Sequence, residues 1–204
     1  MIKLHYHPIS TYSHRVLIAA AEKGIELDLS VVDVLNKQQK TEEYQQINPY
    51  CRIPAIEDGN FVLYESTTIL QYLEEKYPNN PLMPESVQER ALTNMHIRLC
   101  DQEFTNHVIY ILKQIAFLPK DQWDLSGIKQ AKELINSHLD KLSKEVDSQE
   151  FIVGNQFTLA DICYATFVPY LKVMGITAPD ELAPWIKNIT GRESVKSVLP
   201  PNVK

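Results

Sequence analysis

Apolar and polar residues alternate at the start of the chain and then recur at helical spacing. Residues 2–6 alternate, which predicts a half-buried strand. Residues 15–23 are a run of good helix formers stopped by Gly24, so a helix is expected there. Alternation resumes over residues 27–34, and the three segments together predict a β-α-β unit with a right-handed crossover.

Two short apolar runs on either side of Asp58-Gly59 predict a β-hairpin over residues 55–64, because that pair supplies the positive φ angles of a tight turn. Pro54 cannot donate a backbone hydrogen bond, so it belongs at the start of an edge strand, and the peptide bond before it is a candidate for the cis form. A helix follows, with Ser66 expected to cap it. A polar segment before the hairpin completes the order β-α-β-α-β-β-α, which is typical of a thioredoxin-like domain.

Prolines indicate where this domain ends. Three of them fall within residues 78–84 and cannot continue either a helix or a central strand. We therefore expect a first domain over residues 1–78, a linker over residues 79–87 and an all-helical second domain over residues 88–204. The fold class is α/β followed by all-α.

Helical periodicity dominates the second domain. Residues 88–118 are amphipathic but too long for one helix without a bend, and residues 126–146 form a second amphipathic stretch. Residues 163–174 are apolar nearly all round, which predicts a buried central helix that Pro169 kinks or ends.

A capping box is predicted just before that central helix. In F-T-L-A-D-I, Thr158 takes the N-cap position and Asp161, three residues on, the reciprocal acidic position. Both residues are therefore expected to be structural rather than catalytic.

Composition excludes several classes of protein. The chain has 204 residues, of which 44% are hydrophobic, so it can form a substantial core. A formal charge of −6 argues against nonspecific nucleic-acid or anionic-membrane binding. No run of about 18 apolar residues could span a bilayer, and the first residues are too polar for a secretory signal, so a soluble, cytoplasmic protein is expected.

Cysteines and histidines give no metal or disulfide pattern. Cys51, Cys100 and Cys163 are odd in number and far apart, which suits a reducing compartment. The six histidines are scattered as well. We expect no bound metal.

Two ordered motifs point to a family. The stretch from Asn48 to Leu73 contains N-P-x-x-x-I-P-A-I-x-D-G and then E-S-x-x-I-L-x-Y-L, which resembles the glutathione-binding half of the glutathione transferase superfamily. The F-T-L-A-D-I element resembles its all-helical C-terminal domain, so the resemblance covers essentially the whole chain. It implies a serine-type, phi- or theta-like bacterial member.

The resemblance also implies a glutathione site, built from Gln39, Lys40, Arg52, Ile53, Glu65 and Ser66. The backbone of Ile53, before the candidate cis-proline Pro54, pairs with the cysteinyl unit by strand addition. Glu65 and Ser66 hold the γ-glutamyl end; alternatively, they are only an acidic helix start. Lys40, with Gln39 beside it, meets the glycine carboxylate or is merely a solvated charge, and Arg52 is a second candidate for that carboxylate.

Thiol ionisation is the chemical problem of such a site. A free cysteine thiol titrates near 8.5, and lowering its pKa by about two units takes roughly 2.7 kcal/mol of preferential stabilisation of the anion. Ser10 precedes the first helix, where a hydroxyl and a helix N-terminus coincide, and the loop resembles the phi-type loop with Ser10 as the donor to sulfur. Ser13 and Tyr12 are alternative donors, or Ser10 only caps the helix.

Two further residues are harder to interpret. Cys51 stands where the family commonly has glycine, and it is either a small buried filler or a thiol able to form a mixed disulfide with glutathione. Asp101 resembles in location an acid that some classes lend across the dimer to the γ-glutamyl amine.

Two functional hypotheses follow from different classes. The first is a homodimeric glutathione transferase that uses glutathione as co-substrate and attacks a small hydrophobic electrophile. The second is a binding protein on the same fold, similar to the bacterial stringent starvation protein that associates with RNA polymerase, because residues 12–16 and 81–84 resemble that protein. Glutathione-dependent isomerisation or peroxide reduction would use the same thiolate.

Overall fold

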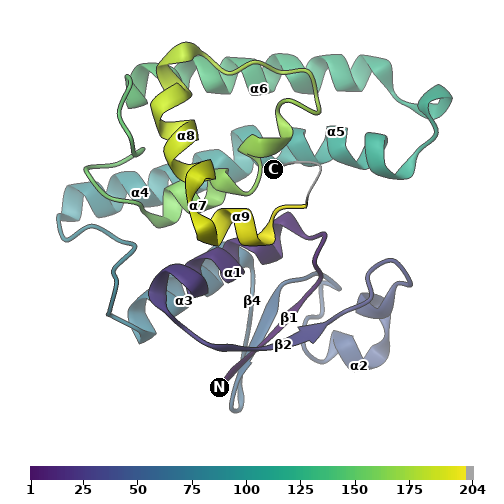
Figure 1. The fold of residues 1–204 in the computed structure, drawn as a ribbon. Helices are drawn as coiled ribbons and strands as arrows, with labels where there is room; N and C mark the ends of the chain where they lie inside the picture. Colours follow the sequence, from purple (N-terminus) through teal and green to yellow (C-terminus); the bar gives the residue numbers. More distant parts are fainter. Residues whose placement is uncertain (201–204) are drawn as a thin grey trace. The chain divides into compact units, whose positions relative to one another are not determined.

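A mixed sheet forms the centre of the N-terminal part of the chain. In residues 1–200, which the computed structural model describes, four strands pair in the order β2-β1-β3-β4. They are β1 (Ile2–Tyr6), β2 (Leu27–Val31), β3 (Ala55–Asp58) and β4 (Phe61–Tyr64). β2 runs parallel to β1, whereas β3 is antiparallel to both β1 and β4 (Figure 1).

Two helices pack side by side on the sheet, namely α1 (Thr11–Lys23) and α3 (Ser66–Lys76) (Figure 1). Their apolar faces and the sheet share a buried core of Ile2, Leu4, Val16, Ile56, Ile69 and Leu73. The short α2 (Glu42–Gln45) precedes the hairpin. The predicted β-α-β-α-β-β-α order and thioredoxin-like fold class are therefore confirmed.

Local details of the hairpin and its helix differ from the prediction in two places. Asp58 pairs with Phe61, so the turn is Gly59–Asn60, one position later than expected, and Gly59 supplies the positive φ of 60°. Glu65 rather than Ser66 is the N-cap of α3, because Ser66 is already the first helical residue, and the Ser66 hydroxyl accepts a hydrogen bond from Arg15. The bond before Pro54 is cis, as predicted.

A buried ion pair ties α1 to α3. Lys23 Nζ lies 2.6 Å from Glu74 Oε2, and both side chains are buried. Lys23 also donates to the carbonyls of Asn79 and Asn80, while the Glu74 carboxylate accepts the N–H of Leu82. These contacts hold the proline-containing segment after α3 against the ends of the two helices.

The second part of the chain is helical, and its helices are α4 (Val87–Leu99), α5 (Asn106–Phe117), α6 (Leu125–Val146), α7 (Leu159–Ala165) and α8 (Ala183–Gly191). A π-helical turn, Cys100–Thr105, joins α4 to α5. It interrupts the α-helical stretch within residues 88–118, where a bend is expected from the sequence. This helical arrangement confirms the second half of the predicted fold class.

The central helix α7 is shorter than its apolar pattern predicts. Every residue of α7 is buried, as expected, but the helix ends at Ala165 and a 3-10 turn follows at Val168–Tyr170. The prediction of a helix over residues 163–174 is thus right for residues 163–165 and wrong for residues 166–174. Pro169, which has no N–H to donate, lies in the 3-10 turn.

The predicted capping box is present at the start of α7. The Asp161 carboxylate is fully buried and accepts four hydrogen bonds. Thr158 contributes its N–H and its hydroxyl, both at 2.8 Å, to Oδ2. Ile152 N–H at 3.1 Å and Trp185 Nε1 at 2.8 Å donate to Oδ1, so one side chain joins the helix start to two other segments.

By its internal contacts the chain divides into two units. The first comprises Met1–Leu82 with Glu193–Pro200, and the second Met83–Arg192. The C-terminal segment of the first unit contains α9 (Glu193–Val198), which packs on α1. The Ser194 hydroxyl of α9 donates a hydrogen bond to the Glu22 carboxylate of α1. The predicted linker over residues 79–87 stays a prediction. Within residues 1–200 no helix has both the length and the apolar character needed to cross a membrane.

Candidate functional site

The loop of residues 7–10, called here the Ser10 loop, leads from β1 into α1. Ser10 is the N-cap of α1: its backbone is extended and its Oγ accepts the N–H of Ser13 at 3.2 Å. The Ser10 N–H donates to the carbonyl of His7 at 2.9 Å, which closes the loop as a turn. Ser10 is half-buried, so its hydroxyl lies at the helix N-terminus with partial access to solvent.

Of the alternative hydroxyls, Ser13 is fully buried, and its Oγ has no hydrogen-bond partner in the described part of the chain. A ligand in solution cannot reach it without displacing the core. Tyr12 is half-buried, and the guanidinium of Arg15 lies over its ring at 5.0 Å. Accessibility and position at the helix end therefore favour Ser10 over Ser13.

The corner before β3 is fixed by two donors to one carbonyl. The carbonyl of Arg52 accepts the Tyr44 hydroxyl at 2.9 Å and the Asn48 side-chain amide at 2.8 Å. Tyr44 and Asn48 are buried, and burial raises the pKa of Tyr44 well above its ordinary value, so its hydroxyl remains a donor. Ile53 is half-buried and follows this anchored carbonyl, whereas the Arg52 side chain is exposed.

Glu65 and Ser66 lie where β4 passes into α3. Glu65 is exposed and has a φ of 73°, a left-handed conformation that a residue with a side chain rarely adopts. Ser66 is buried, and its Oγ accepts from Arg15 Nη1 at 3.4 Å. Strained backbone of this kind concentrates at functional sites.

Arg15 is a residue that the sequence reasoning missed as part of the site. It is fully buried, although its charge is costly to bury, and it lies in the first turns of α1, where it contacts both Tyr12 and Ser66. It therefore links the helix that follows the Ser10 loop to the Glu65-Ser66 corner. The signal available in the sequence was a cation directly before the apolar run Val16–Ala21 of the same helix.

Strand register brings three of these features to one end of the first unit. His5, the next-to-last residue of β1, pairs with Ala55, and Ala55 pairs with Tyr64 at the end of β4. The corner before β3 directly precedes Ala55, the start of α3 directly follows Tyr64, and the Ser10 loop begins two residues after His5. Ser10, Ile53, Glu65 and Ser66 therefore lie at the same end of the sheet, as a common binding site requires.

The predicted carboxylate-binding residues lie in and around a 3-10 turn, Gln38–Lys40, before α2. Lys40 is exposed, and Lys37 beside it has a φ of 62°. Gln39 is half-buried, and its side-chain oxygen is buried without a hydrogen-bond partner among the described residues. As an amide oxygen it can only accept a hydrogen bond, so it suits a donor group of a ligand and not a carboxylate.

Two further residues carry predicted roles, one in each unit. Cys51 has a φ of 56° and is half-buried, with its Sγ 3.9 Å from the carbonyl of Pro49. Asp101 lies in the π-helical turn of the second unit. The roles suggested for Cys51 and Asp101 stay predictions.

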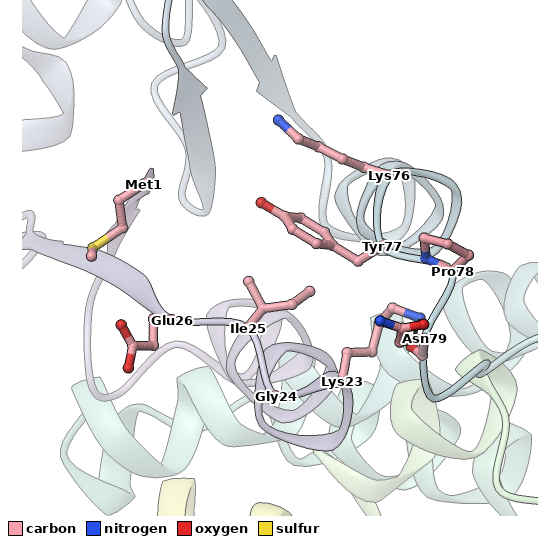
Figure 2. Close-up of a pocket in the computed structure, with 9 residues that line it drawn as sticks. All are labelled: Met1, Lys23, Gly24, Ile25, Glu26, Lys76, Tyr77, Pro78 and Asn79. Atoms are coloured by element: carbon pink, nitrogen blue, oxygen red, sulfur yellow. Dashed lines mark hydrogen bonds between the residues drawn. The ribbon is translucent and has the colours of Figure 1, made fainter.

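A separate pocket opens at the opposite ends of α1 and α3 (Figure 2). Its volume is about 480 Å³, and Ile25, Lys76, Tyr77 and Pro78 are among its lining residues. Figure 2 shows Lys76 and Tyr77 reaching from α3 and the segment after it towards the space in front of Met1. None of the predicted site residues lines it.

Comparison with known sequence families gives two matches. The family described as "Glutathione S-transferase, N-terminal domain" matches residues 9–76, and "Glutathione S-transferase, C-terminal domain" matches residues 114–188. The first match includes Ser10, the corner before β3 and the start of α3.

Individual relatives cover most of the chain. A maleylacetoacetate isomerase from Dictyostelium discoideum is 32% identical, over 76% of this chain and 72% of its own length. A stringent starvation protein A homolog from Coxiella burnetii is 28% identical, over 98% of this chain and 91% of its own. The crystal structure of a glutathione transferase from Populus trichocarpa superposes with a TM-score of 0.86 at 28% identity, covering 97% of both chains.

Proposed function

Because this chain belongs to the glutathione S-transferase superfamily, we propose that it is a glutathione transferase that ionises the thiol of glutathione for attack on small hydrophobic electrophiles. Membership supports glutathione-dependent activity in general. The observation that carries the finer proposal is Ser10, a half-buried hydroxyl at the N-terminus of a 13-residue helix.

The hydrogen bonds of Ser10 leave it free to act as a donor. A serine hydroxyl has one hydrogen and two acceptor positions. Since Ser10 Oγ already accepts the N–H of Ser13, its own hydrogen is left to point at a thiolate outside the helix. The accepted bond polarises the hydroxyl in the direction that strengthens this donation.

The magnitudes are adequate for a neutral-pH nucleophile. A charge-assisted hydrogen bond contributes roughly 1.5–3 kcal/mol and a helix N-terminus about 0.3–1 kcal/mol more. The sum of these two contributions spans the roughly 2.7 kcal/mol that lowers a thiol pKa by two units. The thiolate then donates its electron pair to form the new carbon–sulfur bond, and the displaced leaving group departs with the electrons of the bond that breaks.

The remaining residues hold the peptide. Ile53 offers its backbone to the cysteinyl unit, and Glu65 and Ser66 receive the γ-glutamyl end. Lys40 and Arg52 pair with the glycine carboxylate, and Gln39, next to Lys40, assists through the N–H groups of its side-chain amide. We further propose that the protein acts in the cytoplasm as a homodimer, in keeping with its family.

Two relatives support other functions for the same site. Similarity to a stringent starvation protein A homolog favours a protein-binding role without catalysis, while similarity to a maleylacetoacetate isomerase favours glutathione-dependent isomerisation. Copurification with RNA polymerase and no affinity for glutathione would support the first. Turnover of a cis-configured diacid without consumption of glutathione would support the second.

Steady-state kinetics with glutathione and a small apolar electrophile test the proposal. Ser10→Ala should keep the KM for glutathione within about threefold and lose most of kcat, because the hydroxyl interacts mainly with the anion. Ser13→Ala is the matched control, since Ser13 offers no accessible hydroxyl, and it should retain kcat. Equal kcat in wild type and Ser10→Ala would refute the role of Ser10.

A further inference from the structure

His14 is a buried histidine that the proposed chemistry does not use. It lies in the second turn of α1 and is only 1% exposed. Its Nε2 is 2.7 Å from the carbonyl oxygen of Pro8, in the middle of the Ser10 loop. The side chain therefore crosses from the helix back to the loop that precedes it.

The geometry fixes the tautomer of His14. A carbonyl oxygen can only accept, so Nε2 carries the hydrogen and donates it to Pro8. Nδ1 is then unprotonated, and it is buried without a hydrogen-bond partner among residues 1–200. Burial lowers the pKa of His14 more than its bond to Pro8 raises it, so the ring is neutral at pH 7.

The Ser10 loop has few other restraints. Two hydrogen bonds stay within the loop, namely Ser10 N–H to the His7 carbonyl and Ile9 N–H to His7 Nδ1 at 3.2 Å. Two more join α1 to the last residue of the loop only: Ser13 N–H to Ser10 Oγ and His14 N–H to the Ser10 carbonyl at 3.0 Å. The bond from His14 is thus what holds the middle of the loop to the body of α1.

We propose that His14 is a positioning residue, which clamps the Ser10 loop to α1 and so holds the Ser10 hydroxyl in the orientation from which it donates to the thiolate. The catalytic part of this inference rests on the proposed function. The clamp itself does not, because it is a property of the unliganded chain.

Two amide variants distinguish a hydrogen bond donated to Pro8 from simple filling of the space that the His14 side chain occupies. The amide nitrogen of glutamine takes nearly the place of His Nε2, whereas that of asparagine takes the place of Nδ1 and falls short of Pro8. We expect His14→Gln to keep the wild-type kcat and bound-thiol pKa. His14→Asn should lower kcat at neutral pH about tenfold and raise the pKa of the bound thiol, with the KM for glutathione within about twofold, as expected for loss of one hydrogen bond.

Amide hydrogen exchange gives a readout without any ligand. The Ser10 N–H should exchange faster in His14→Asn than in His14→Gln or wild type, all measured well below their melting temperatures. Equal exchange and equal thiol pKa in the two variants would overturn the clamp. If wild type fails to ionise glutathione, the proposed function falls, and the exchange comparison alone then decides for or against His14.

Discussion

The buried carboxylate of Asp161 allows a stability prediction to be worked from its contacts. Asp161→Asn keeps the shape of the side chain but replaces one acceptor oxygen with a donor amide. Two donors reach each oxygen: the N–H and hydroxyl of Thr158 on one, and the N–H of Ile152 and Trp185 Nε1 on the other. In either orientation of the new amide, its NH2 group faces two donors instead of acceptors.

The amide should turn towards Thr158, because a hydroxyl can rotate and accept, whereas the indole Nε1 and the backbone N–H groups cannot. One buried N–H, that of Thr158, is then left without an acceptor, which costs about 1–3 kcal/mol. Burial raises the pKa of Asp161, so removing the charge recovers part of this loss. We expect a net loss of roughly 1–2 kcal/mol in the free energy of unfolding.

Urea denaturation followed by tryptophan fluorescence measures this change directly. Trp185 is fully buried and donates to Asp161, so its emission reports on the same contact. Asp161→Ala is the comparison variant and should lose more, since all four donors are then unpaired. A denaturation midpoint for Asp161→Asn equal to or above that of wild type would refute this account of the network.

Three other substitutions test separate contacts. Thr158→Ala removes a cap and should cost about 0.5–2 kcal/mol with near-normal ligand affinity, whereas Thr158→Ser should restore stability; an unchanged melting temperature would remove the capping role. Lys23→Met leaves the buried Glu74 carboxylate without its cation and should lower the free energy of unfolding by roughly 3–5 kcal/mol. Adding Glu74→Gln should recover most of that loss, and no recovery in the double variant would contradict the pairing. Burial lowers the pKa of His138 to about 4, so as the pH falls this histidine is protonated in the unfolded chain before it is protonated in the folded chain. The free energy of unfolding should therefore fall by up to roughly 3 kcal/mol between pH 6.5 and pH 4. In urea titrations at several pH values, His138→Gln should weaken the pH dependence of the free energy of unfolding. The same pH dependence in His138→Gln and wild type would contradict the role of His138.

Features governed by neighbouring residues could be predicted from the sequence. The end of α1 at Gly24 follows from left-handed backbone, the capping box from a three-residue spacing, and the hairpin from two apolar runs around a turn. In each case the physical cause lies within a few positions along the chain.

Features governed by distant residues could not be predicted. Ser66 has the side chain of a cap, yet its hydroxyl is taken by Arg15, which is 51 positions away. The Lys23–Glu74 pair spans the same separation and leaves no local pattern. For the candidate site, the resemblance to a family identified Ser10 and the Glu65-Ser66 pair, but only strand register explains why they lie at the same end of the sheet.

Titration of the purified protein with glutathione at neutral pH, followed by the ultraviolet absorbance of the thiolate, tests the central claim most directly. Wild type should bind glutathione and show thiolate absorbance, while Ser10→Ala should bind it with little such absorbance. Binding with equal thiolate absorbance in both proteins would contradict the role of Ser10. Absence of binding in wild type would contradict the transferase assignment itself.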